Sequence, residues 1–407
     1  MPANYANVLL NALASTAGGG ITYLRNILPR LSECDDVKHF FALVPPEKLN
    51  EYQSFAHDRV KIETVTVNGD LLGRLWWEQT SLRSYITSRN IDVLVSLGNF
   101  ALFSSAVPQI LFSRNDLYFS DSFRCDLRSR GLHSALIGHR LKSWLARFSI
   151  KQADINVTPT KAFADRISAC DGLNAYEFEV LHFGFDSDVF TSNVEPLPAE
   201  KLAKINLSES CYRLLYVSHY NYFRNFETLI RALPIIKKRI KEETGKEFQL
   251  VLTTDIRRGA VHGGYDSTLA ADLIDRVGAH EDIAMLGSVH YDKLHRLYRL
   301  CDVFICPSYS ESFGHPLVEA MAMGLPVVAA DMSVHREVCG EAAVYFNVFD
   351  ERELAGQCVK ALTDQRLNES LRIKGLERSR DFSWDQHVSG LMTLVERALS
   401  KRRRKRK

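Results

Sequence analysis

The sequence predicts an α/β protein built from two doubly wound parallel sheets. Short apolar runs typical of buried strands alternate with longer segments whose apolar residues recur at helical spacing, and this alternation is typical of parallel sheets. The chain has 407 residues, which is enough for two domains that each bury their own core. A polar stretch with two prolines, residues 191–210, separates the alternating pattern into two halves.

Composition and charge are those of an ordinary globular protein. Apolar residues make up 46% of the chain and charged residues 25%, with a net charge of +2. The 8 cysteines are scattered, with no C-x-x-C and no histidine at metal-ligand spacing, which predicts buried free thiols. We expect no signal peptide at the start of this sequence, and no apolar run approaches the ~18 residues of a membrane span. We therefore expect a cytoplasmic protein that can contact a membrane only from its surface, on the inner face.

The pattern divides the chain into five parts. We expect an N-terminal Rossmann-like domain over residues 1–190, a linker over 191–210 and a C-terminal Rossmann-like domain over 211–383. A last helix over residues 384–400 and a basic tail over 401–407 complete the chain. Strands are predicted first at residues 7–14, 40–44, 60–65, 93–96 and 109–113, with a strand and its loop over 153–160, then at 213–218, 248–253, 303–306 and 327–330.

The most informative stretch is residues 307–326, with the sequence PSYSESFGHPLVEAMAMGLP. It lies between the apolar runs 303–306 and 327–330, so it predicts a strand, a glycine-bearing loop, a helix and a strand. Pro316 suits the first turn of that helix, where its missing N–H is not needed. Doubly wound sheets bind ligands at loops of this kind.

The side chains of this loop suit a nucleotide sugar. Glu311 and Glu319 are carboxylates that can accept hydrogen bonds from hydroxyl-rich ligands such as sugars and ribose. Phe313, Gly314 and His315 precede or open the helix, where unpaired N–H groups and the helix dipole favour phosphate. The structural alternative is that Glu311 is a helix-start carboxylate and Glu319 a salt-bridged surface residue.

Glu311 and Glu319 form an E-x7-E pattern that, with its surroundings SESFGHPLVEAMAMGLPVV, resembles the signature of the retaining glycosyltransferases of family 4. The resemblance runs over most of the chain. It implies the GT-B fold, in which two Rossmann-like domains face a central cleft. It also implies a metal-independent hexosyltransferase without a cofactor, whose donor is a nucleoside diphosphate sugar and whose acceptor is a glycan or lipid-linked molecule of cell-surface polysaccharide or glycolipid synthesis. Glu311 would hold the transferred sugar, and Glu319 the ribose.

The resemblance places further donor contacts in the C-terminal half. In the family, the loop after the first strand of this half carries an arginine and, five residues on, a lysine, both on the donor pyrophosphate; here that spacing gives His219 and Arg224. Arg224 keeps a cation that can hold phosphate bidentately, whereas an imidazole with a reference pKa of ~6.5 is a weaker cation at neutral pH. The alternative to diphosphate binding is that Arg224 is a surface residue and His219 caps a helix. Ser288 and Val289 resemble the turn beneath the base, which backbone atoms could contact.

The N-terminal half offers a glycine loop and a departure from the family. Gly19 and Gly20 follow the first strand, but Tyr23 stands where a G-x-G-x-x-G motif needs its third glycine, so a nicotinamide site is not expected. The resemblance instead predicts that the donor phosphates approach Gly19 and Gly20, with a plain turn as the alternative. Family members often carry a histidine near the transferred sugar, and this chain has Arg114 and Asn115 at that place instead. The sequence therefore does not identify which polar group lies beside the sugar.

Three other features of the sequence have more than one interpretation. Asp186 and Asp188 form a D-x-D pattern, a Mn²⁺ motif of the other large glycosyltransferase fold, but their linker-like context predicts no metal. Residues 124–151, from Arg124 to Lys151, are basic and amphipathic, which fits either an anionic membrane surface or a solvated helix face. The tail from Lys401 to Lys407 could bind anionic lipid or keep the chain in solution, and without a base-reading module we expect no specific nucleic acid.

Two rival functions remain at this point. A GT-B epimerase acting on a nucleotide sugar would turn over its donor without any acceptor. A noncatalytic protein of the same fold would bind a sugar nucleotide and never turn it over.

Overall fold

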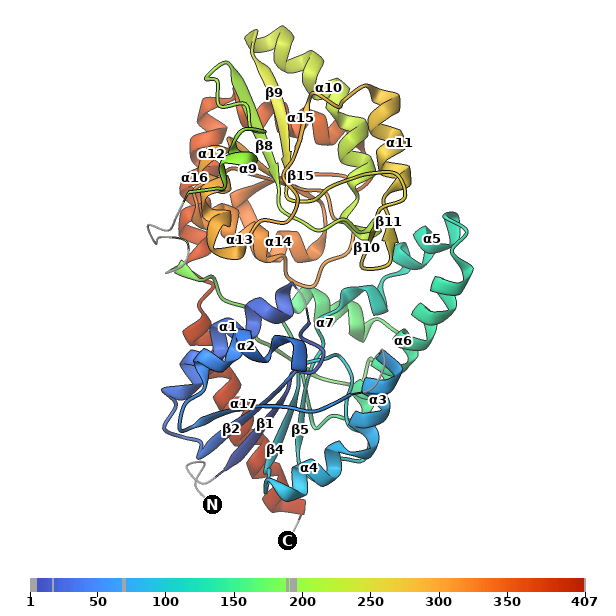
Figure 1. Cartoon of the computed structure of the whole chain (residues 1–407), viewed down its shortest axis with the longest axis vertical. Coiled ribbons are helices and arrows are strands. Elements are labelled where there is room, and N and C mark those ends of the chain that lie inside the picture. Colours follow the sequence, from blue (N-terminus) through green and yellow to red (C-terminus); the bar gives the residue numbers. More distant parts are fainter. Residues whose placement is uncertain (1–5, 17, 68–70, 188–189, 191–195, 406–407) are drawn as a thin grey trace. The chain divides into compact units, whose positions relative to one another are not determined.

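The computed structural model describes residues 6–16, 18–67, 71–187, 190 and 196–405, and it divides into two compact units. The first unit comprises residues 1–120, 127–184 and 383–407, and the second comprises residues 121–126 and 185–382. Each unit holds one parallel sheet with helices packed around it (Figure 1). The predicted pair of doubly wound parallel sheets is therefore confirmed.

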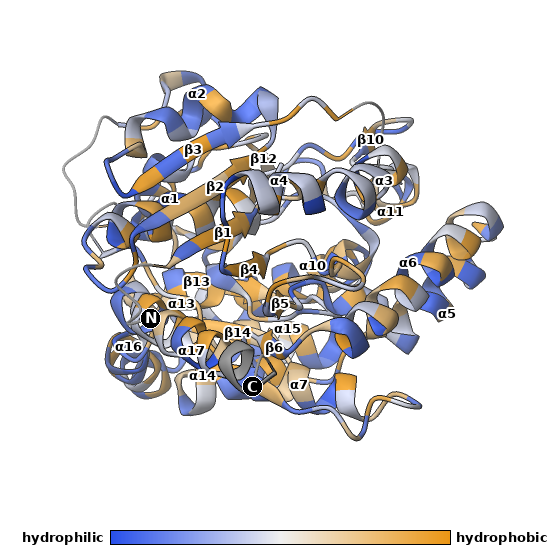
Figure 2. Ribbon diagram, turned by 90° about the horizontal axis from the view of Figure 1, so that it is seen from below, coloured by the Kyte–Doolittle hydropathy of each residue, from blue (hydrophilic) through white to orange (hydrophobic). Residues whose placement is uncertain are grey.

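The first sheet has 7 strands in the order β3-β2-β1-β4-β5-β6-β7, and every neighbouring pair is parallel. Its strands are β1 (Asn7–Asn11), β2 (His39–Val44), β3 (Val60–Thr64), β4 (Val93–Ser96), β5 (Gln109–Phe112), β6 (Ile155–Thr158) and β7 (Phe178–Val180). The central strands β4 and β5 are buried along their whole length, as a parallel sheet covered on both faces requires. In Figure 2 they are hydrophobic, whereas the edge strand β3 mixes hydrophobic and hydrophilic residues.

The helices of this unit are α1 (Gly19–Ser32), α2 (Leu49–Tyr52), α3 (Leu71–Thr80), α4 (Leu82–Ser88), α6 (His133–Gln152), α7 (Lys161–Ser168) and α17 (Trp384–Lys405). Helix α17 comes from the end of the chain and packs along the sheet beside β4 and β5 (Figure 1). Its buried residues recur at helical spacing, at Trp384, Val388, Leu391, Val395 and Ala398. Each buried valine or leucine among them contributes roughly 1.5–3 kcal/mol to the free energy of unfolding.

The second sheet has 6 strands in the order β12-β9-β8-β13-β14-β15, again all parallel. They are β8 (Cys211–Tyr216), β9 (Glu247–Leu252), β12 (Ile283–Met285), β13 (Val303–Cys306), β14 (Val327–Ala330) and β15 (Ala343–Phe346). The helices are α9 (Ala199–Leu202), α10 (Phe226–Thr244), α11 (Thr268–Val277), α12 (Leu294–Leu300), α13 (His315–Ala322), α14 (Ser333–Cys339), α15 (Glu351–Thr363) and α16 (Gln365–Ser379). A short antiparallel hairpin, β10 (Val261–His262) and β11 (Tyr265–Asp266), was not expected from the sequence.

The unit boundaries differ from those expected. Residues 185–190, expected in the N-terminal domain, belong to the second unit. Phe190 is fully buried against Tyr291 and Tyr298, with ring centroids 5.5 and 6.0 Å apart, which explains the difference. Of the expected linker, residues 191–195 lie outside the described residues, while helix α9 belongs to the second unit. The chain returns to the first unit at Ser383.

The basic stretch at residues 124–151 is two helices rather than one. Helix α5 (Asp121–Ser129) ends shortly before Gly131, and α6 begins at His133. Gly131 has φ of 69°, a left-handed conformation that favours glycine and interrupts the helical path.

Candidate functional site

The loops after β8 and β13 leave the carboxyl edge of the second sheet side by side. Strands β8 and β13 are neighbouring parallel strands, so both loops start at the same edge. From β8 the sheet continues through β9 to β12, and from β13 it continues in the other direction through β14 to β15. This reversal of strand order is the topological switch point, where open α/β sheets bind ligands.

Backbone and side-chain hydrogen bonds join the two loops. The Tyr309 N–H donates to the Phe223 carbonyl at 2.9 Å, and the Asn225 side-chain amide donates to the Pro307 carbonyl at 3.0 Å. Asn225 has φ of 55°, a conformation that asparagine tolerates better than most residues, and it is buried. The hydroxyl of Tyr216, at the end of β8, donates to the Arg224 carbonyl at 2.9 Å. These bonds fix the backbone on which Arg224 and Glu311 are carried.

Arg224 and Glu311 form an ion pair at this edge. Nη1 of Arg224 donates to Oε2 of Glu311 at 2.5 Å and to the Ser308 hydroxyl at 3.3 Å. The Arg224 side chain is 25% exposed and that of Glu311 11%. Burial works against the arginine charge, but the Glu311 carboxylate raises the pKa of Arg224 above its ordinary value. The pair is thus a partly desolvated cation and anion, fixed by loops from two adjacent strands.

Helix α13 follows Glu311 and starts at His315, with Pro316 in its first turn as predicted. Gly314 precedes it with φ of 91°, a left-handed conformation that favours glycine, and a Cβ there would also lie 2.8 Å from Leu317 Cδ1, so that side chain would have to shift. Phe313 is only 1% exposed, and its ring packs against Phe382 and His315 with centroids 5.5 and 5.1 Å away. The Phe313 side chain is therefore a core residue, and its predicted part in donor binding is restricted to its backbone.

Glu319 is a buried carboxyl on α13. It is 5% exposed, and the Tyr298 hydroxyl on α12 donates to its Oε2 at 2.7 Å. Burial raises the pKa of Glu319 to about 7, although the Tyr298 hydrogen bond lowers it and the nearby Asp186 raises it further. The alternative of a salt-bridged surface residue is wrong, because Glu319 is buried and bonded to a tyrosine.

His219 lies at the surface, on the loop that also carries Arg224. Partial burial, Arg224 and His262 each lower the pKa of His219 below its ordinary value, which favours the neutral imidazole at pH 7. His262 comes from the β10–β11 hairpin, which packs on the same loop: its ring lies 5.8 Å from that of Tyr220. Tyr265 of the hairpin lies 5.0 Å from Tyr222, measured between ring centroids.

The end of β12 carries Ser288 and Val289, which were predicted to lie beneath the base. Nζ of Lys201, on α9, donates to the carbonyls of Leu286 at 2.5 Å and Ser288 at 2.8 Å. Lys204 donates to the Met285 carbonyl at 2.9 Å. Sequence reasoning missed these lysines because they fall within the stretch assigned to the linker.

Gly19 and Gly20 lie in the first unit, at the start of helix α1. A Cβ at Gly20 would lie 3.0 Å from Ser15 Cα, so this turn has little room for a side chain. The Gly19 carbonyl accepts a 2.7 Å hydrogen bond from Arg114. The Arg114 guanidinium lies 4.5 Å from the centre of the Tyr23 ring, and burial lowers its pKa to about 10.

Asn115 caps the short helix at Asp116–Phe119, because its side-chain oxygen accepts from the Leu117 N–H at 3.2 Å. Its own N–H and that of Arg114 both donate to Asn99 Oδ1, at 2.8 and 2.6 Å. The predicted donor-binding residues Gly19, Gly20 and Asn115 thus lie at the carboxyl ends of β1 and β5 in one unit. Glu311, Arg224, His219, Glu319 and the base loop lie in the other.

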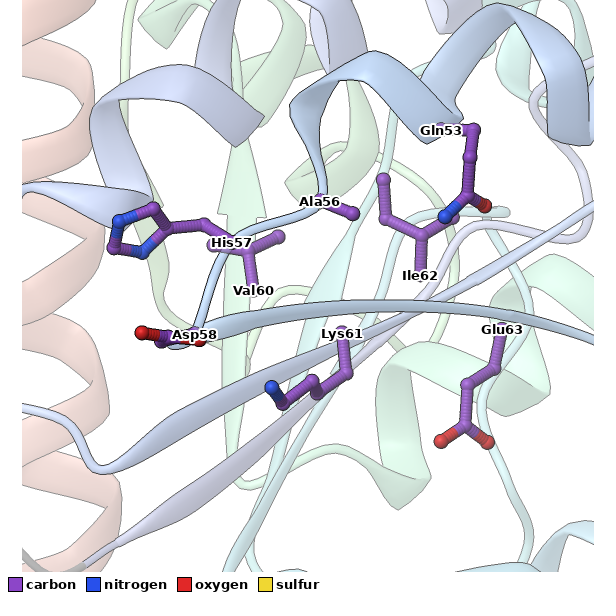
Figure 3. A pocket seen from close by; sticks show the side chains of 8 residues that line it. All are labelled: Gln53, Ala56, His57, Asp58, Val60, Lys61, Ile62 and Glu63. Carbon is purple, nitrogen blue, oxygen red and sulfur yellow. The ribbon is translucent and has the colours of Figure 1, made fainter.

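Two surface hollows lie away from these residues. One of about 560 Å³ lies in the first unit beside β3, where Lys61 and Glu63 extend from one side of the strand and Ile62 from the other (Figure 3). The second, of about 340 Å³, is lined by Cys339, Lys374 and Arg378 in the second unit. Neither contains a predicted site residue, and we assign neither to the site.

Neither a metal cluster nor a membrane span is found in the described part of the chain. Within residues 6–405, apart from the gaps given above, no three His, Cys, Asp or Glu residues are grouped to hold a metal ion. Asp188 of the D-x-D pattern lies outside the described residues. None of the helices in the described ranges combines the length and apolarity needed to cross a membrane.

Known proteins share this fold and part of this sequence. Residues 199–378 match the family model of the glycosyl transferases group 1. O-antigen chain mannosyltransferase B of Escherichia coli is 28% identical over 194 residues, which cover 48% of this chain and 47% of that protein. A D-inositol 3-phosphate glycosyltransferase of Salinispora arenicola is 30% identical over 264 residues, covering 62% and 56%. The chain thus spans about half the length of these curated relatives.

Solved structures extend the likeness over almost the whole chain. Sucrose-phosphate synthase of Thermosynechococcus elongatus superimposes with a TM-score of 0.70 at 16% identity, covering 97% of this chain and 100% of that one. Anabaena Alr3699/HepE, solved with UDP-glucose, gives a TM-score of 0.66 at 16% identity, covering 95% and 99%.

The two parallel-sheet units have the GT-B fold. Residues 199–378, the part of the chain that matches the model of the glycosyl transferases group 1, carry Arg224, Glu311 and Glu319.

Proposed function

We propose that this chain is a retaining glycosyltransferase that moves a hexose from a nucleoside diphosphate sugar to a glycan or lipid-linked acceptor. The observation that carries the proposal is the Arg224–Glu311 pair at the switch point of the second sheet, with a 2.5 Å hydrogen bond between the two side chains. A phosphate-binding cation beside a hydroxyl-accepting carboxylate is what a nucleotide sugar requires at the bond to be broken.

Arg224 and His219 would stabilise the departing diphosphate. Arg224 is charged at any physiological pH and presents a fork of N–H donors that matches phosphate. His219 is neutral without a ligand, and a diphosphate beside it would favour its protonated form. The start of α13, at Gly314 and His315, adds backbone N–H groups and the positive end of the helix dipole.

Glu311 would hold hydroxyls of the transferred sugar once the donor arrives. In the ligand-free protein, Arg224 donates to Glu311. A diphosphate competes for the same guanidinium, so donor binding would free the Glu311 carboxylate to accept from the sugar. Glu319 would accept from the ribose.

Retention at the anomeric carbon needs no side-chain nucleophile in this proposal. The oxygen of the departing phosphate would take the proton of an acceptor hydroxyl that arrives on the same face of the sugar. Arg224 and His219 would neutralise the growing charge, so we expect no metal and no cofactor. In the first unit, Gly19, Gly20 and Asn115 would supply further donor contacts.

The names of the relatives guide the choice of sugar and acceptor. Mannosyltransferases of O-antigen synthesis and inositol-phosphate glycosyltransferases are both among them. We therefore propose mannose, glucose or a similar hexose as the sugar, and a role in cell-surface polysaccharide or glycolipid synthesis.

We also propose that α6 contacts an anionic membrane surface. Ile137, Leu141 and Trp144 lie on one face of α6 and are 69%, 49% and 58% exposed. Arg140, which is also exposed, borders this apolar strip. An exposed apolar strip beside basic residues is typical of a helix that lies in a lipid interface. The basic tail at residues 401–407 would add roughly 1 kcal/mol per charge near such a surface.

Co-sedimentation with vesicles tests the membrane contact. The Ile137→Ser, Leu141→Ser, Trp144→Ser triple variant should lose most binding to vesicles that contain anionic lipid. Ile373→Ser, which changes a residue on α16 that is 57% exposed, should bind like the unchanged protein. Equal binding of the triple variant would remove α6 from the proposal.

A turnover assay with and without acceptor tests the enzymatic proposal. The purified protein is incubated with UDP- and GDP-hexoses, and nucleotide release is followed while the anomeric configuration of the product is read by NMR. Transfer with retention is expected. Donor turnover without acceptor would identify an epimerase, and donor binding without any turnover would identify a noncatalytic protein.

A further inference from the structure

The carboxyl ends of β9 and β12 meet next to the proposed phosphate site. Strand β9 lies between β8, whose loop carries Arg224, and the edge strand β12. Beyond the strands, the Leu286 N–H donates to the Leu252 carbonyl at 2.9 Å, and the Ile256 N–H points to Met285 Sδ at 3.4 Å. A nucleotide whose phosphates lie at Arg224 would therefore reach this pair of loops with its base.

Asp255 is the carboxylate at this junction. It lies in the loop that follows β9 (Glu247–Leu252), and its Oδ2 lies 3.1 Å from where a Cβ of Gly287 would be. Gly287 has φ of 65°, so the backbone before Ser288 turns close to the Asp255 carboxylate at a position that favours glycine. Arg257 pairs with Asp255 at 3.4 Å, and the two side chains are 72% and 37% exposed. An exposed pair of this kind holds a carboxylate weakly, so the pair can open for a ligand.

Lysines engage three backbone carbonyls at the end of β12 and in the loop that follows it. Lys201 binds the carbonyls of Leu286 and Ser288, and Lys204 binds that of Met285. Asp255 adds a carboxylate beside these engaged carbonyls, and an ionised carboxylate accepts at two oxygens and donates nothing.

A carboxylate distinguishes the nucleobases by their N–H groups. The Watson–Crick edge of guanine presents two neighbouring donors, N1–H and the N2 amino group, which match the two oxygens of a carboxylate. Uracil presents one N–H between two carbonyl oxygens, and those carbonyls are repelled by a carboxylate. A matched bidentate contact of this kind discriminates by roughly 1–3 kcal/mol, and the unmatched base adds a penalty through its unpaired or opposed groups.

We propose that Asp255 reads the base of the donor and selects guanine, so that the donor is a GDP-sugar rather than a UDP-sugar. This inference rests on the proposed function, since it assumes that the second unit binds a nucleoside diphosphate. Gly287 is a positioning residue in this proposal, because it leaves room for the Asp255 carboxylate.

Calorimetric titration with GDP and UDP tests the proposal without knowledge of the sugar or acceptor. The unchanged protein should bind GDP on the order of 10-fold more tightly than UDP. Asp255→Asn should bring this ratio close to one, chiefly by weakening GDP, because an amide both donates and accepts and so suits the uracil edge. Gly287→Ala should reduce the ratio in the same direction by displacing the carboxylate.

Two controls separate base reading from other effects. Asp272→Asn removes a carboxylate from another exposed pair, with Arg258, and should leave the ratio unchanged. Arg224→Ala should weaken both nucleotides alike. Equal or tighter binding of UDP by the unchanged protein, or an equal loss of both nucleotides in Asp255→Asn, would overturn the base assignment. If folded protein bound neither nucleotide, the proposed function itself would fail, and this inference with it.

Discussion

Tyr298 donates its hydroxyl hydrogen to Oε2 of Glu319 at 2.7 Å, between two side chains that solvent barely reaches. Burial raises the pKa of Glu319 to about 7, and the tyrosine limits this rise because its hydrogen bond stabilises the ionised form. The two residues lie on α12 and α13, so the charge state of a carboxyl proposed to hold the ribose depends on a neighbouring helix.

Donor affinity should therefore fall in acid. Only ionised Glu319 accepts hydrogen bonds at both oxygens, so donor affinity should drop as pH falls below about 7, by up to tenfold per pH unit if the protonated form does not bind. Tyr298→Phe removes the bond that lowers the Glu319 pKa, so the midpoint should move to higher pH. Titrations with a nucleoside diphosphate sugar between pH 5.5 and 8.5 measure it. Tyr345→Phe, which removes a hydroxyl that donates to the Gly340 carbonyl, is the control, and an unchanged midpoint in Tyr298→Phe would contradict the prediction.

His219 should give a pH dependence of opposite sign. Its pKa is lowered in the free protein by burial, Arg224 and His262, and a bound diphosphate would raise it. Binding should then take up a proton, and this contribution to affinity should grow as pH falls from the pKa of the complex towards that of the free protein. Calorimetry in buffers of different ionisation enthalpy counts the protons. His219→Lys should abolish the uptake, His280→Ala should not, and uptake that persists in His219→Lys would assign it elsewhere.

Substitutions of Arg224 and Glu311 should have non-additive effects on the free energy of unfolding, because the two side chains form an ion pair. Arg224→Ala leaves the Glu311 carboxylate, which is 11% exposed, without its cation and should lower the free energy of unfolding by about 2 kcal/mol. The double variant Arg224→Ala, Glu311→Gln should be less destabilised than the sum of the single changes by about 1 kcal/mol. Urea denaturation of the four proteins measures the cycle. Strict additivity would mean that the ion pair contributes nothing in solution.

Gly184 should tolerate no side chain. A Cβ there would overlap the Trp384 backbone nitrogen and lie 2.5 Å from Trp384 Cγ and 2.7 Å from the Ser383 carbonyl carbon. Because backbone atoms cannot give way, Gly184→Ala should cost about 3 kcal/mol in the free energy of unfolding. Gly138→Ala is the matched control: α6 has open space at that position, so it should be stabilised by about 0.5–1 kcal/mol. Similar melting temperatures for the two variants would refute the close packing.

Periodicity predicted the framework of the fold. The strands β4, β13 and β14 were located to the residue, because each is a compact apolar run between polar boundaries. The β10–β11 hairpin could not be predicted, since strands of 2 residues have no period to read. The boundary before residue 190 was misplaced because Phe190 is buried by aromatic rings distant in sequence, which the local pattern does not reveal.

The site was predicted in its residue types more than in its contacts. Motif spacing located Glu311 and Arg224, and the structure adds that they form an ion pair. The motif spacing did not reveal that Phe313 belongs to the core, that Asn115 caps a helix or that Tyr298 donates a hydrogen bond to Glu319. The contacts that Asp255 and Lys201 make with the loop after β12 were not predicted, since nothing in their local sequence reveals them.

The central claim is that Glu311 acts in sugar transfer. The most direct test compares turnover of Glu311→Ala with that of Glu341→Gln, a change at an exposed carboxylate that pairs with Lys374 in the same unit. Both variants should fold, and both should bind the nucleoside diphosphate. Glu311→Ala should lose transfer by at least about 100-fold, while Glu341→Gln keeps it. An unaltered turnover rate in Glu311→Ala would contradict the assignment.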